Sequence, residues 1–124
     1  MIIAQANDVR ILIIDDDKLI RWVLQEICAQ DGHDVTDVAD TESACRAIKT
    51  GLYDMIFADL ETEAFDAQEI AGKIKIHQPG ASIVLFSSRP RREVESLFRG
   101  ISSIGIVGKP FEASVVRSLI DELH

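Results

Sequence analysis

Three carboxylates, one hydroxyl and one amine follow short apolar runs of this sequence. Asp15 and Asp16 come after "ILII", Asp59 after "MIFA", Ser87 at the end of "IVLFS" and Lys109 after "IVG". Clustered carboxylates repel one another unless a cation neutralises them, and their hard oxygen atoms suit Mg²⁺. A carboxylate beside such a cation can attack a phosphoryl group, while an amine and a hydroxyl stabilise the transition state. If these side chains lie close together, we expect the formation of an aspartyl phosphate.

This chemistry gives each residue an expected role. Asp16 and Asp59 are predicted to bind Mg²⁺ directly, and Asp15 to hold a metal-bound water or to orient the ligands. Lys109 is predicted to supply a positive charge and Ser87 a hydrogen bond. Asp17 is expected to begin the next helix as its N-cap, because the site needs only two acids at this point.

These side chains can meet only if the apolar runs are neighbouring strands of one sheet. Runs typical of strands buried on both faces lie at 10–14, 34–38, 54–58, 82–86 and 104–107. Between and after them, apolar residues recur with helical spacing at 20–27, 44–48, 70–74, 94–101 and 116–123. Thr41 is predicted to cap the second helix. The alternation predicts an α/β fold: a doubly wound, five-stranded parallel sheet with five helices and a site beyond the carboxyl ends of its strands.

Composition narrows the class of protein further. The 124 residues, 1–124, are expected to form a single domain. A net charge of -8 argues against direct nucleic-acid binding, which needs a basic surface. No apolar run is long enough for a membrane span, and the first ten residues, "MIIAQANDVR", do not resemble a signal peptide. We therefore expect a cytoplasmic domain without a membrane partner.

Over essentially its whole length the chain resembles the receiver domains of two-component response regulators. The resemblance is carried by "ILIIDDDKLIRWVL", which is especially similar to receivers of the NtrC type, and by "YDMIFADLE", "IVLFSS" and "IVGKPF". It implies a CheY-like (flavodoxin-like) fold with Asp59 as the phosphoacceptor. It also implies the remaining roles: Asp15 and Asp16 as the acidic pair, Ser87 as the switch hydroxyl, Lys109 as the family's lysine, and the backbone carbonyl of Glu61 as a further Mg²⁺ ligand.

The resemblance also implies a function. A sensor histidine kinase or a phosphotransfer protein would donate a phosphoryl group to Asp59 with Mg²⁺, changing partner binding or homodimerisation, with transcriptional control as one context. Such a domain assists its own phosphotransfer and dephosphorylation and is not an enzyme acting on separate substrates. Two alternatives stay open. One is an interaction module with weak or no phosphorylation. The other is a small phosphatase with an aspartyl nucleophile, because the segment "DLET" resembles the motif of such enzymes.

Several positions depart from the family pattern. Thr62 and Glu63 stand where most receivers have Met-Pro, and Ala67 stands where a glycine is usual. Ile106 replaces the tyrosine or phenylalanine that turns inward on activation in many receivers. Glu61 and Glu63 add negative charge near the site, which is expected to change the rate of phosphorylation or the lifetime of the phosphoryl group, in a direction that the sequence leaves open.

Overall fold

The strands form one parallel sheet whose order reverses at its centre. In the computed structural model, which describes residues 9–100 and 104–123, the order is β2-β1-β3-β4-β5. The strands are β1 (Arg10–Ile14), β2 (Asp34–Val38), β3 (Met55–Ala58), β4 (Ser82–Ser87) and β5 (Ile104–Gly108). The chain moves outward from β1 in one direction to β2 and in the other to β3, so a crevice opens between the loops after β1 and β3.

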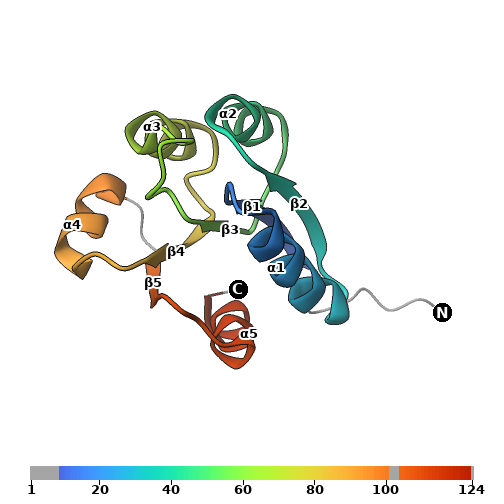
Figure 1. Cartoon of the computed structure of the whole chain (residues 1–124). Helices are drawn as coiled ribbons and strands as arrows, with labels where there is room; N and C mark the ends of the chain where they lie inside the picture. Colours follow the sequence, from blue (N-terminus) through green and yellow to red (C-terminus); the bar gives the residue numbers. More distant parts are fainter. Residues whose placement is uncertain (1–8, 101–103, 124) are drawn as a thin grey trace.

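Helices cover both faces of the sheet. They are α1 (Lys18–Gln30), α2 (Thr41–Thr50), α3 (Ala67–His77), α4 (Arg91–Glu95), continued by the short helix η1 (Ser96–Phe98), and α5 (Ala113–Leu123). One apolar cluster joins the sheet to α2, α3, α4 and η1, and a second joins it to α1 and α5. Figure 1 shows these two layers, with α2 and α3 on one side of the sheet and α1 and α5 on the other. The predicted doubly wound fold is confirmed.

Burial explains why these runs of sequence become strands. In β1, Leu12 and Ile14 enter the first cluster while Ile11 and Ile13 enter the second, so consecutive side chains are buried on opposite faces. The same holds for β3 and β4, which are buried throughout. The prediction fails for β2, whose residues are exposed or half-buried, and for most of β5, whose first three residues are half-buried, because these strands are the two edges of the sheet.

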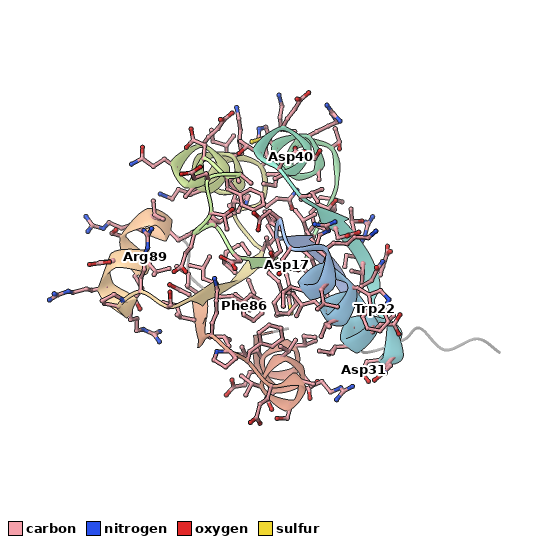
Figure 2. All side chains as sticks on the ribbon, viewed as in Figure 1. Asp17, Trp22, Asp31, Asp40, Phe86 and Arg89 are labelled. Carbon is pink, nitrogen blue, oxygen red and sulfur yellow. The ribbon has the colours of Figure 1, made fainter. Side chains whose placement is uncertain are left out.

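Helix starts were predicted with mixed success. Asp17 caps α1 as expected: its Oδ1 accepts hydrogen bonds from the amides of Leu19 and Ile20 at 2.9 and 3.3 Å. The prediction of Thr41 as a cap is wrong by one residue, because the side chain of Asp40 caps α2. Figure 2 labels both aspartates. The Thr41 hydroxyl instead accepts from the main-chain amide of Asp66, the residue that caps α3, and so ties the starts of α2 and α3 together.

The fourth helix is shorter than the apolar spacing predicts. It ends at Glu95 and gives way to η1, whose Phe98 is fully buried in the first cluster. The predicted helical stretch ran on to Ile101, which lies outside the described residues. No helix in the described ranges is long and apolar enough to cross a membrane.

Candidate functional site

The carboxyl ends of four strands bring the predicted site residues to one edge of the sheet. Asp15 follows β1, Asp59 follows β3, Ser87 ends β4 and Lys109 follows β5. The pairing of β1 with β3 continues one residue past the strands, because the Asp59 amide donates to the carbonyl of Ile14 at 2.9 Å. Backbone pairing between the strands therefore fixes the positions of the Cα atoms from which these side chains extend.

Asp59 and Lys109 form a close ion pair at the centre of this edge. Lys109 Nζ lies 2.6 Å from Asp59 Oδ2, and Asp59 Oδ1 accepts a hydrogen bond from the amide of Glu61 at 3.2 Å. Asp59 is only 9% exposed. Burial acts to lower the pKa of Lys109, but its hydrogen bonds to Asp59 and Glu61 and their charges raise the pKa above its ordinary value. The ammonium therefore stays charged beside the carboxylate.

Asp15 is a buried carboxylate with few hydrogen bonds to offset the cost of burying its charge. It is 3% exposed, and its Oδ1 accepts a hydrogen bond from the amide of Asp17 at 2.9 Å. Burial raises the pKa of Asp15 to about 6 against the effect of that hydrogen bond, and the charges of Asp59 and Asp16 add to the rise. Asp16 is exposed. Of the two adjacent acids, the structure therefore buries Asp15, not the residue predicted to be the direct ligand.

This edge of the sheet holds a cavity that is open to solvent and has two carboxylates in its wall. Asp15, Asp59 and Lys109 line a space of about 190 Å³, bounded on the other side by apolar residues: Ile20, Phe86, Pro110 and Phe111. Within the described ranges, no three or more His, Cys, Asp or Glu side chains are arranged so that they could hold a metal ion together. The donors fit Mg²⁺ in the manner in which it binds through one or two carboxylates and completes its shell with water. The predicted roles of Asp16 and of the Glu61 carbonyl as ligands stay predictions.

The side chain of Glu61 occupies a central place that the sequence did not reveal. Its carboxylate accepts a hydrogen bond from the Ser87 hydroxyl. It also accepts hydrogen bonds from the amide and the hydroxyl of Ser88, both at 3.2 Å, and from Lys109 Nζ at 3.3 Å. Burial alone would raise the pKa of Glu61, but these donors outweigh it and lower the pKa to about 2. Arg89 Nε, on the exposed side, lies 4.0 Å away. The sequence signal was an acid two residues after Asp59, from which we predicted only added negative charge near the site and a carbonyl ligand.

The loop that carries Glu61 is anchored in the core. Phe65 is buried in the cluster shared by α2 and α3, and its amide donates to the carbonyl of Thr62 at 3.3 Å. Glu63 and Ala64, between them, are exposed. The loop therefore follows a defined course without the Met-Pro of the family pattern. Ile106, which stands in place of the usual aromatic residue, is half-buried and packs against the same cluster.

Comparisons with known proteins agree on one family for this chain. The model of the family described as "Response regulator receiver domain" matches residues 11–121. The chain is 23% identical over 113 residues to the response regulator protein FleR of Pseudomonas aeruginosa, and 26% identical over 113 residues to the DNA-binding transcriptional regulator NtrC of Azospirillum brasilense. Each match covers 90% of this chain but only 24% of FleR and 23% of NtrC. The chain thus spans about a quarter of the length of these regulators.

A solved structure supports the same fold. The receiver domain of the sensor histidine kinase PA1611 from Pseudomonas aeruginosa superposes with a TM-score of 0.77 at 19% identity. The match covers 94% of this chain and 97% of that domain.

Proposed function

This chain belongs to the response regulator receiver family, and we propose that its Asp59 accepts a phosphoryl group from the phosphohistidine of a sensor histidine kinase or a phosphotransfer protein. One observation carries the proposal: a nearly buried carboxylate at the carboxyl end of β3 is paired with an ammonium at 2.6 Å and lines a cavity with a second carboxylate. This is the arrangement that nucleophilic attack on phosphorus requires, because the lysine can neutralise charge that develops on the transferred group.

The transfer can be written step by step. An oxygen of Asp59 attacks the phosphorus, the phosphorus–nitrogen bond to the donor imidazole breaks, and the imidazole nitrogen keeps the electron pair. Lys109, which already contacts Asp59 Oδ2, stabilises the oxygens of the transferred group, and the hydroxyl of Ser87 can donate a hydrogen bond to them. The product is an aspartyl phosphate on Asp59.

Mg²⁺ fits the site through Asp15 and Asp59, which line the same cavity. Asp16 and the backbone carbonyl of Glu61 are the further ligands that the family resemblance implies. When bound, Mg²⁺ would neutralise the repulsion between the carboxylates and part of the phosphoryl charge. The structure of the PA1611 receiver domain is described with a magnesium ion coordinated in its active-site cleft, which supports this part of the proposal.

The output of the domain is a change of conformation and of partner. Phosphorylation adds a charge of about -2, which draws Ser87 and Lys109 toward the phosphoryl oxygens and shifts an existing equilibrium between two conformations. Partner binding or homodimerisation would then follow. The similarity to NtrC, named as a DNA-binding transcriptional regulator, supports a context in transcriptional control.

Incubation with Mg²⁺ and a small phosphoryl donor tests the proposal. We expect intact-protein mass spectrometry to show the addition of one phosphoryl group that is labile to hydroxylamine, as an acyl phosphate is. Asp59→Asn should abolish the addition, whereas Asp121→Asn, an exposed acid on α5, should leave it unchanged. Phosphorylation of Asp59→Asn to the same extent as the wild type would refute Asp59 as the acceptor.

A further inference from the structure

The Glu61 carboxylate already occupies the hydrogen-bond donors that a phosphoryl group on Asp59 would need. The Ser87 hydroxyl, the Ser88 amide and hydroxyl, and Lys109 Nζ all donate to it. Lys109 Nζ contacts Asp59 Oδ2 at the same time, so the carboxylates of Asp59 and Glu61 share one ammonium group. An anion attached to Asp59 would therefore extend toward donors that are already in use.

The contacts of Glu61 are strong enough to matter for ligand binding. Its side chain is only 17% exposed, and hydrogen bonds to a charged group at a partly dry site are stronger than those between neutral groups. The loop holds Glu61 in reach, since Phe65 is fixed in the core four residues later.

We infer that Glu61 is an internal competitor of the phosphoryl group: its carboxylate holds Ser87, Ser88 and Lys109 in the unphosphorylated protein and must leave them before they can bind a phosphoryl group on Asp59. This inference rests on the proposed function of Asp59 and adds a regulatory role for one side chain. The apparent affinity for a phosphoryl group or its mimic equals the intrinsic affinity multiplied by the fraction of molecules in which Glu61 has moved away.

Simple charge repulsion is a different explanation, and the chain itself offers a control for it. Glu63 lies in the same loop, carries the same charge and is exposed. Removing the charge of Glu63 tests repulsion in solvent, whereas truncating Glu61 to alanine also frees the donors. Changes to either side chain keep the main-chain carbonyl of Glu61, which is a predicted Mg²⁺ ligand.

Titration with beryllofluoride in the presence of Mg²⁺, followed through the Ser88 amide by NMR, tests the inference. We expect Glu61→Ala to lower the half-saturating concentration by about tenfold, the factor that corresponds to the loss of one hydrogen bond to a charged group. Glu61→Gln should lower it by less, because the amide oxygen can still accept a hydrogen bond from Ser87 or Ser88. Glu63→Gln should stay within about twofold of the wild type, the range expected for an exposed charge. Before any ligand is added, the Ser88 amide resonance should shift in both Glu61 variants and not in Glu63→Gln.

Two results would overturn the inference, and they can be told apart. If the Glu61 variants bind beryllofluoride no more tightly than Glu63→Gln does, Glu61 does not compete, although Asp59 can still be the acceptor. If neither the wild type nor any of these variants responds to beryllofluoride, the proposed function fails and the competition fails with it.

Discussion

Replacing Asp15 by asparagine should make the metal-free protein more stable at neutral pH, although it removes an acid from the candidate site. The asparagine side chain has nearly the same shape, and its oxygen can still accept the hydrogen bond that the Asp17 amide donates to Asp15 at 2.9 Å. The substitution would remove a charge from a residue that is only 3% exposed and lies near Asp59 and Asp16. Burial of an uncompensated charge costs free energy.

The size of the effect follows from the pKa of Asp15. The pKa rises from 3.8 to about 6 on folding, which corresponds to about 3 kcal/mol at 1.36 kcal/mol per unit. Because the cavity is open at the edge of the sheet, solvent screening reduces the expected gain to about 1–2 kcal/mol. The folded protein binds this proton more tightly than the unfolded chain does. The contribution of Asp15 to stability is therefore lost as the pH rises from about 4 to about 6, and the variant lacks this pH-dependent contribution.

Urea denaturation followed by circular dichroism between pH 4 and 7.5 measures this difference. We expect the variant to exceed the wild type by about 1–2 kcal/mol at pH 7.5 and the two to converge near pH 4. Mg²⁺ should stabilise the wild type more than the variant, since it binds only the folded form. Asp16→Asn is the matched control, because Asp16 is exposed and its loss should change the metal-free stability little. An Asp15→Asn protein that is less stable than the wild type at pH 7.5, or a difference independent of pH, would refute the reasoning.

Three further substitutions test other contacts. Asp17→Ala removes the cap of α1 and should lower the free energy of unfolding in urea by about 1 kcal/mol; an unchanged midpoint would contradict the capping role. The Gln78 side chain donates to two main-chain carbonyls at the end of α2 and accepts from the amide two residues before β3, so Gln78→Ala should cost about 2–4 kcal/mol in the same assay. Lys109→Met removes the partner of Asp59 and should slow its phosphorylation by about 100-fold, measured by mass spectrometry over time; an equal rate would exclude Lys109 from the transfer.

The positions of the site residues could be predicted from the sequence because they depend on local pattern and on one property of parallel sheets. The apolar runs alternate with segments of helical spacing, and this alternation defines which residues end each strand. Parallel strands have their carboxyl ends at the same edge of the sheet. Asp15, Asp59, Ser87 and Lys109 therefore had to lie at one edge. The N-cap role of Asp17 was equally local, since a cap needs only its own helix.

What the side chains do at that edge was decided only by the tertiary structure. Glu61 contacts Ser87, 26 residues away, and Lys109, 48 residues away, and no spacing rule predicts such contacts. The burial of Asp15 rather than Asp16 likewise depends on the turn after β1 and on the walls of the cavity. The physical reason is the same in both cases: the sequence determines where a strand ends, but the direction of a side chain beyond that end depends on groups that other strands bring to it.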